Sequence, residues 1–301
     1  MDTFREILSR LPSSVRQELE ALPNSVINEI EEIRLRCGQH VRLQTSSGEK
    51  IISHIVTAEE LVKVLNSLIK YSYYAYEEDL AKGFVTIEGG HRVGICGKAI
   101  VKDGQTSLIK EISSMNIRFA KEIRGCSDKI ARYLAGGDGR PLSTLIVSPP
   151  GCGKTTMLRD IARSLSRRGI KVAVCDERSE IAGMYNSQPS FDLGSRTDVL
   201  DGAAKAQGIQ MLIRSMSPQV IITDEIGKRE DLEAAAQCLS SGVALITSIH
   251  GNSFDSLKKS EIWPLISKRF FSSVIFLSNK EGPGTVTEAV TGDGMGEDIH
   301  D

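Results

Sequence analysis

The spacing of apolar and polar residues divides the chain into two halves of different character. In the first half, residues 3–22 predict short amphipathic helices and residues 30–56 alternate as strands. A capping box at residues 57–60 predicts the start of a further helix. Three more strand-like runs follow, at residues 83–87, 92–101 and 113–120. This mixture predicts a smaller N-terminal α+β domain over residues 1–135.

In the second half the apolar runs are nearly continuous. They predict core strands at residues 144–147, 171–175, 219–223, 243–249 and 273–278. Strands that are apolar on both faces suit a parallel sheet that is covered by helices on both sides. We therefore predict an α/β domain over residues 136–280. Residues 281–301 are acidic, polar and rich in glycine, and we expect them to form a disordered tail.

Composition narrows the possible classes of protein. The formal net charge is −2 over 301 residues, which argues against a protein that coats nucleic acid, because such proteins have a basic footprint. No apolar run is long enough to predict a membrane-spanning helix, and the first residues lack the apolar core of a signal peptide. The six cysteines are scattered without a Cys-x-x-Cys pair, so we expect reduced thiols and a cytoplasmic protein.

The most specific motif lies between a predicted strand and a predicted helix, at residues 148–156. A Gly-rich loop in this context turns its backbone N–H groups around phosphate oxygens. Lys154 would reach the β- and γ-phosphates of ATP, and the Thr155 hydroxyl would ligate Mg²⁺. Ser148 replaces the first glycine of the usual pattern, which removes no phosphate ligand. The predicted nucleotide-binding residues are Pro150, Gly151, Cys152, Gly153, Lys154, Thr155 and Thr156.

Two acids directly follow the apolar strand at residues 219–223. This is the form of a Walker B element, so Asp224 is predicted to hold Mg²⁺ and Glu225 to orient or deprotonate the attacking water. Two carboxylates at the end of a buried strand are costly without a cation. With the phosphate loop upstream, a metal site is favoured over a surface acid pair. Together the two motifs predict a RecA-like P-loop NTPase core.

Further polar residues end other predicted strands. Ligands of open parallel sheets bind at the carboxyl ends of the strands, so Asp176 or Glu177 could position water. Alternatively, these acids cap a helix and pair with Arg178. His250 is placed to sense the γ-phosphate or to relay the state of Glu225, or it is a hydrogen-bonded histidine with no catalytic part.

Hydrolysis of ATP builds negative charge on the γ-phosphate, and an arginine from a neighbouring subunit often meets it. Arg92 and Arg118, in strand-like runs of the first half, are candidates for this role. Arg196 and Arg214 are candidates within the second half. Each of them could equally be a solvated or salt-bridged residue.

Several of these motifs together resemble a known family. The chain resembles the stage III sporulation protein AA family, a divergent branch of the type II/type IV secretion ATPase superfamily. The resemblance spans most of residues 3–280, and its segments at 176–180 and 195–198 are far more specific than the phosphate loop. The motifs that carry it lie at residues 89–94, 148–156, 176–182, 195–200, 213–218 and 223–227.

The resemblance implies roles for individual residues. Arg92 and Arg118 look like the interdomain arginines that complete a neighbouring subunit's site in hexameric rings. Two positions depart from the superfamily: Asp224 stands where a glycine is usual, and the residues around His250 read Ser-Ile-His-Gly-Asn instead of Thr-x-His-Thr-Asn. By similarity, Asp176 and Glu177 belong to the Asp box of the superfamily. Glu225 belongs to its Walker B element, and His250 to its His box.

The resemblance also implies a function and partners. We expect an ATP-hydrolysing motor that works as a homo-oligomeric ring, a hexamer, and uses ATP and Mg²⁺. It would energise assembly of, or transport through, a membrane channel between mother cell and forespore during endospore formation. Its implied partners are membrane channel proteins of the same sporulation operon, and the protein itself would lie in the cytoplasm at the inner face of the membrane, on the mother-cell side. Nucleic acid is not an expected partner. The alternatives are a nucleic-acid-binding ATPase and a nucleotide-gated scaffold with negligible turnover.

Overall fold

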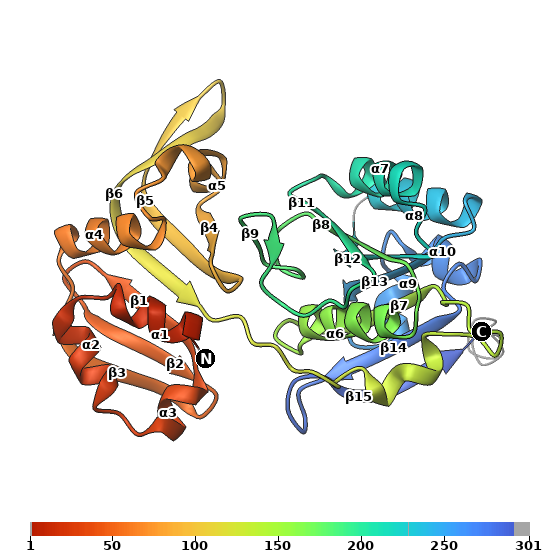
Figure 1. The fold of residues 1–301 in the computed structure, drawn as a ribbon, viewed down its shortest axis with the longest axis horizontal. Helices are drawn as coiled ribbons and strands as arrows, with labels where there is room; N and C mark the ends of the chain where they lie inside the picture. Colours follow the sequence, from red (N-terminus) through yellow and green to blue (C-terminus); the bar gives the residue numbers. More distant parts are fainter. Residues whose placement is uncertain (1, 228, 292–301) are drawn as a thin grey trace. The chain divides into compact units, whose positions relative to one another are not determined.

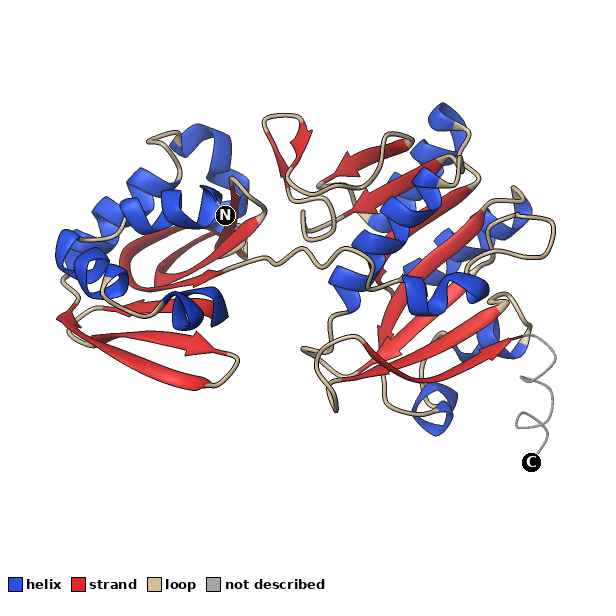
Figure 2. Cartoon of the chain, turned by 60° about the horizontal axis from the view of Figure 1, so that its bottom comes forward, coloured by secondary structure: helices blue, strands red, loops and turns tan. Residues whose placement is uncertain are grey.

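A computed structural model describes residues 2–227 and 229–291 of the chain (Figures 1 and 2). The chain folds into two compact units. The first unit comprises Met1–Lys121 and Gly183–Ser190, and the second comprises Glu122–Ala182 and Phe191–Asp301. Residues 122–135, which the sequence pattern groups with the N-terminal domain, therefore belong to the second unit.

The first unit is built on an antiparallel sheet with the strand order β3-β2-β1-β6-β5-β4. The predicted capping box is confirmed, because Thr57 and Glu60 each accept from the other's backbone N–H at the start of α4. The elements are α1 (Asp2–Ser9), α2 (Ser13–Glu20), α3 (Asn24–Glu29), β1 (Ile30–Arg36), β2 (His40–Thr45), β3 (Gly48–Ile55), α4 (Ala58–Leu68), the 3₁₀ helix η1 (Tyr73–Tyr76), α5 (Glu77–Ala81), β4 (Phe84–Ile87), β5 (His91–Lys102), β6 (Gln105–Arg118), β9 (Met184–Tyr185) and β10 (Gln188–Pro189).

The second unit is built on a sheet with the strand order β11-β8-β12-β13-β7-β14-β15, in which only the pairing of β14 with β15 is antiparallel. The predicted parallel α/β architecture is confirmed. The elements are the 3₁₀ helix η2 (Asp128–Tyr133), β7 (Thr144–Ser148), α6 (Lys154–Arg167), β8 (Val172–Asp176), β11 (Thr197–Asp201), α7 (Lys205–Met216), β12 (Val220–Glu225), α8 (Arg229–Ser240), β13 (Ala244–His250), α9 (Phe254–Lys258), α10 (Trp263–Ser267), β14 (Ser273–Ser278) and β15 (Thr285–Thr291).

Helices cover both faces of this sheet, as the apolar runs require. Leu145 and Val147 of β7 belong to the same buried cluster as Ile209 of α7 and Ala235 of α8. The intervening strand residues, such as Ile146, are buried as well, and α6 packs on β7, β8, β12 and β13. In Figure 1 α6 runs beside the central strands, with α7 and α8 grouped together.

Two expectations need correction. Residues 285–291 form β15 and pair with β14, where the composition predicted a disordered tail; the remaining tail residues, 292–301, lie outside the described residues. β11 was not predicted from the apolar pattern either. Both strands lie at an edge of the sheet, where a strand has one neighbour and polar side chains are tolerated, so their burial signal is weak.

A buried histidine, His91, binds the backbone of the segment that follows β6. His91 begins β5 and is only 5% exposed, and the backbone N–H of Ala120 donates to its Nδ1 atom over 3.1 Å. An amide has only a proton to offer, so Nδ1 must be unprotonated in this contact. Burial accordingly lowers the pKa of His91 to about 4. The first unit therefore folds around a neutral imidazole.

We predict that acid selectively destabilises the first unit. Between the ordinary histidine pKa of about 6.5 and the folded value of about 4, only the unfolded chain binds a proton at this residue. The free energy of unfolding therefore falls by about 3 kcal/mol as the pH is lowered through this range. The measurement is urea unfolding between about pH 7.5 and pH 4, followed by the hydrogen-exchange protection of peptides from β5 and β6. It gives the slope of the free energy of unfolding against pH. A His91→Gln protein should have a shallower slope; an unchanged slope would assign the acid sensitivity to other groups.

Candidate functional site

Four neighbouring parallel strands bring the predicted site residues of the second unit to the carboxyl ends of the strands, at one edge of the sheet. The phosphate loop follows β7, His250 ends β13, Asp224 and Glu225 end β12, and Asp176 ends β8. The strand order places β13 directly between β7 and β12. The side chain at the end of β13 is therefore positioned to connect the phosphate loop with the two acids of β12.

The phosphate loop has the backbone that its glycines suggest. Gly151 and Gly153 adopt positive φ angles of 75° and 80°, a region that favours glycine. Gly153 is the N-cap of α6, so the loop turns directly into the positive end of a helix. The backbone N–H of Gly284 donates to the carbonyl oxygen of Cys152 over 2.9 Å. The turn before β15 thus supports the loop.

Lys154, His250 and Glu225 form a continuous chain of polar contacts. The Lys154 Nζ atom lies 2.8 Å from His250 Nδ1, and His250 Nε2 lies 2.9 Å from Glu225 Oε2. A lysine ammonium can only donate, so Nδ1 accepts, and Nε2 carries the proton that points to Glu225. Burial lowers the pKa of Lys154, and the negative charge of Glu225 opposes this effect. His250 is therefore the bridge between the two groups that the sequence assigns to phosphate and water.

A second cation lies among the other acids, and the sequence reasoning missed it. The Lys205 Nζ atom is 2.7 Å from Glu177 Oε2 and 2.9 Å from Asp224 Oδ1. Burial raises the pKa of Asp224, and the Lys205 ammonium opposes this rise. Lys205 opens α7, where the helix dipole disfavours a positive charge. That unfavourable position is the one sequence signal that could have indicated an acidic partner.

The two acids at the end of β8 have different environments. Asp176 is fully buried, and its carboxylate accepts from the backbone N–H groups of Glu180, Ile181 and Ala182 over 2.8–3.0 Å. Its carboxylate holds the loop after β8 in place, which corrects the expectation that Asp176 could position water. Glu177 is partly exposed and pairs with Lys205. The sequence analysis considered Arg178 as its partner, and the observed partner is Lys205 instead.

The candidate arginines lie in both units. Arg92 and Arg118 are directly paired across β5 and β6 in the first unit. The Arg92 guanidinium lies 3.8 Å from the Phe84 ring centroid, and Arg118 Nε lies 3.2 Å from Glu32 Oε1. In the second unit, the Arg196 backbone N–H donates to the Ser166 hydroxyl. Arg214 lies in the last turn of α7, where a cation is favourable.

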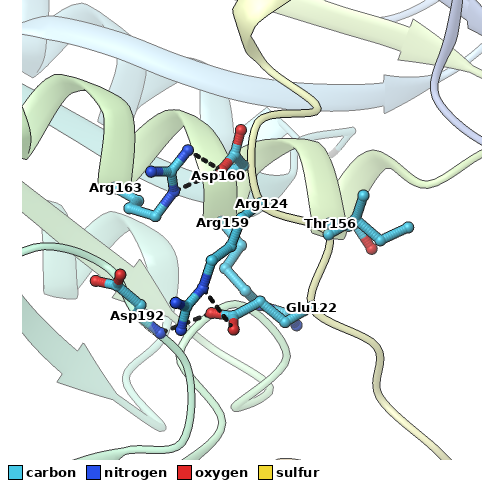
Figure 3. Close-up of a pocket in the computed structure, with 8 residues that line it drawn as sticks. Glu122, Arg124, Thr156, Arg159, Asp160, Arg163 and Asp192 are labelled. Carbon is cyan, nitrogen blue, oxygen red and sulfur yellow. Dashed lines mark hydrogen bonds and ion pairs between the residues drawn. The ribbon is translucent and has the colours of Figure 1, made fainter.

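The helix behind the phosphate loop is held by a cluster of charged residues (Figure 3). Asp160, 3% exposed, pairs with Arg163 and accepts from the backbone of Gly125 and from the backbone and hydroxyl of Ser127. Arg159 donates to backbone carbonyl oxygens of residues 180 and 181 and stacks on a phenylalanine ring. In Figure 3 Arg163 points toward Asp160, and the end of the Arg159 side chain lies between Asp192 and Glu122. These groups satisfy one another, so the cluster positions α6.

The donor set at the edge of the sheet fits Mg²⁺. Asp224 is buried at the end of β12, and the ion pair with Lys205 balances the charge of its carboxylate. No group of three or more His, Cys, Asp or Glu side chains suited to a metal occurs in the described part of the chain. Mg²⁺ needs no such cage, because one carboxylate, a hydroxyl such as that of Thr155 and substrate phosphates suffice.

The family model described as "Sporulation stage III, protein AA" matches residues 1–295. The chain is 42% identical to the stage III sporulation protein AA of Bacillus subtilis (strain 168) over 296 residues, which are 96% of this chain and 95% of that protein.

Solved structures share the fold of this chain. The ATPase DotB of Legionella pneumophila has 16% sequence identity and a TM-score of 0.55, over 86% of this chain and 73% of that one. The pilus retraction motor PilT with bound ADP has 16% identity and a TM-score of 0.56, over 86% and 77%. The predicted RecA-like secretion ATPase fold is therefore confirmed. Among the described residues, no helix is long and apolar enough to cross a membrane.

We predict that α7 tolerates no side chain at Gly208. A Cβ atom there would lie 2.6 Å from the Cys175 Sγ atom of β8, a short and buried side chain that has no room to withdraw. Although alanine favours helix, Gly208→Ala should lower the free energy of unfolding by about 2 kcal/mol. Combining it with Cys175→Ala should restore part of that loss in a double-mutant cycle by chemical denaturation. Strictly additive effects would show that the two residues do not oppose each other.

Proposed function

This chain belongs to the "Sporulation stage III, protein AA" family, and from that premise we propose that it is an ATP-hydrolysing motor of the secretion ATPase type. The observation that carries the proposal is the chain Lys154–His250–Glu225 at the edge of the second sheet. It connects a phosphate-loop lysine to a Walker B acid through one imidazole. A phosphate-binding site with no hydrolytic role has no need of this connection.

Each group of residues in the site has its own role in the proposed hydrolysis of ATP. The backbone N–H groups of the phosphate loop and the Lys154 ammonium bind the β- and γ-phosphates. Thr155 and Asp224 would hold Mg²⁺, which, when bound, neutralises charge that develops between these phosphates. Glu225 orients the attacking water and accepts its proton. His250 fixes the Glu225 carboxylate through its Nε2 proton.

His250 also links nucleotide binding to the state of Glu225. In the structure the Lys154 ammonium donates to His250. A γ-phosphate offers the same ammonium a stronger, charge-assisted acceptor, so ATP would take the lysine from the imidazole. His250 then has a free Nδ1 atom and can reorient together with Glu225. This supports a relay role for His250 over a purely structural one.

We place this activity in a ring of identical subunits. The likeness to DotB and PilT, which are described as an ATPase and a pilus retraction motor, supports the secretion ATPase type. In such a ring, which we propose to be a hexamer, Arg92 or Arg118 of one subunit would complete the site of its neighbour. The motor would act on a membrane channel between mother cell and forespore, from the mother-cell side, through channel proteins of the same operon.

We predict opposite binding behaviour for two site variants. Lys154→Ala should lose ATP binding, because the cation for the β- and γ-phosphates is gone. Glu225→Gln should bind ATP but hydrolyse it at least about 100-fold more slowly, because the amide cannot accept a proton. Measurements of ATP binding and phosphate release test both variants. Glu233→Gln, at an exposed position, is the control. If Glu225→Gln hydrolyses ATP at the native rate, the assignment of Glu225 as the base is incorrect. If the native chain binds ATP without turnover, the protein is a nucleotide-gated scaffold.

We predict that the arginine in the neighbour's site can be found by mixing subunits. Arg92→Ala and Arg118→Ala subunits have an intact phosphate loop but would fail to complete the neighbouring site. Lys154→Ala subunits lack phosphate binding but still supply both arginines. Mixing an arginine variant with Lys154→Ala should therefore restore phosphate release above the sum of the separate proteins, and the arginine that acts across the interface is the one that is rescued. Absence of rescue for both would exclude this arrangement.

A further inference from the structure

Lys205 lies where three elements of the second unit meet. Its ammonium contacts Asp224 from the end of β12 and Glu177 from the loop after β8, at 2.9 and 2.7 Å, while Lys205 itself opens α7. The Lys205 side chain is only 10% exposed. An ion pair with this burial is weakly screened by water, so its geometry constrains all three elements.

The fold brings this lysine into place by a close approach of α7 to the sheet. β11 pairs in parallel with β8 and ends at Asp201, and a short connection leads to Lys205. Gly208, one turn later, lets α7 pack against Cys175 of β8 at a distance that no Cβ atom would permit. The ammonium is thus held over the carboxyl ends of β8 and β12.

The contact with Asp224 is also the contact that a bound divalent cation would need. Asp224 is buried, and the Lys205 ammonium, 2.9 Å from its Oδ1 atom, balances its charge. Two cations cannot share one carboxylate oxygen at close range without strong repulsion. Lys205 and a metal therefore compete for Asp224, whereas Glu177 remains available to the lysine.

We propose that Lys205 is a positioning residue that stands in for the divalent cation: it holds Asp224 and Glu177 in the metal-free state and is displaced from Asp224 when Mg²⁺ arrives with the nucleotide. This inference rests on the proposed function. After displacement the ammonium stays with Glu177 alone, so metal binding changes the restraint on the first turn of α7. The dependence of nucleotide affinity on Mg²⁺ is therefore set by this lysine.

The test compares ADP binding with Mg²⁺ and with EDTA in the full chain, by isothermal titration calorimetry. Lys205→Met keeps the length of the side chain but removes its charge, so Mg²⁺ no longer has to displace a cation. The ratio of the dissociation constant in EDTA to that in Mg²⁺ should rise about tenfold. Lys205→Arg, which retains a cation, and Lys259→Met, at an exposed position, should keep the native ratio. An unchanged ratio in a folded Lys205→Met protein would overturn the proposal.

A second measurement uses the native protein and does not require that any variant folds. Labelling of lysines by acetic anhydride, read by mass spectrometry, reports whether Lys205 is held by its ion pairs. Adding Mg·ADP in place of ADP with EDTA should raise the labelling of Lys205 several-fold relative to Lys259. Equal or lower labelling would overturn the proposal.

This design separates the inference from the proposed function. If the native protein binds no ADP in either condition, the proposed function fails. The contact between Lys205 and Asp224 is then tested with millimolar MgCl₂ alone, in the same labelling experiment against EDTA. A rise in Lys205 labelling supports displacement by the metal, and no rise refutes it.

Discussion

The structure of the second unit depends on how negative charge is tolerated at the buried carboxyl ends of its strands. A carboxylate removed from water is unstable unless a cation or several donors compensate it. The chain meets this requirement in two ways: backbone amides surround Asp176, and an ammonium faces Asp224. The more exposed Glu225 instead contacts an imidazole N–H. These different solutions allow neighbouring acids of one sheet edge to have different functions.

The sequence predicted much of the fold because burial on both faces leaves a strong signal. β7 and β12 are continuous apolar runs, and only strands inside a covered parallel sheet require them. The phosphate loop was equally visible, since its glycines and Lys154 are needed at fixed spacing. Edge strands such as β15 leave no comparable signal, because polar residues are tolerated there.

The site itself was only partly predictable. Spacing along the chain showed that Asp176 and Glu177 end a strand, but it could not show which carboxylate turns into the loop and which faces the site. Lys205 was missed because its acidic partners belong to other strands and become neighbours only when the sheet forms. For His250, spacing along the chain could not show its neighbours, because only the order of the strands places β13 between β7 and β12.

The hydrogen bond from Gly284 to Cys152 joins the phosphate loop to the turn that precedes the last described strand. The carbonyl oxygen of Cys152 therefore acquires this partner only when the chain up to residue 284 is present. During synthesis on the ribosome, a nascent chain that has not yet released residue 284 lacks this backing for its loop. The loop between β7 and α6 therefore gains this support late in synthesis, long after its own residues have left the ribosome.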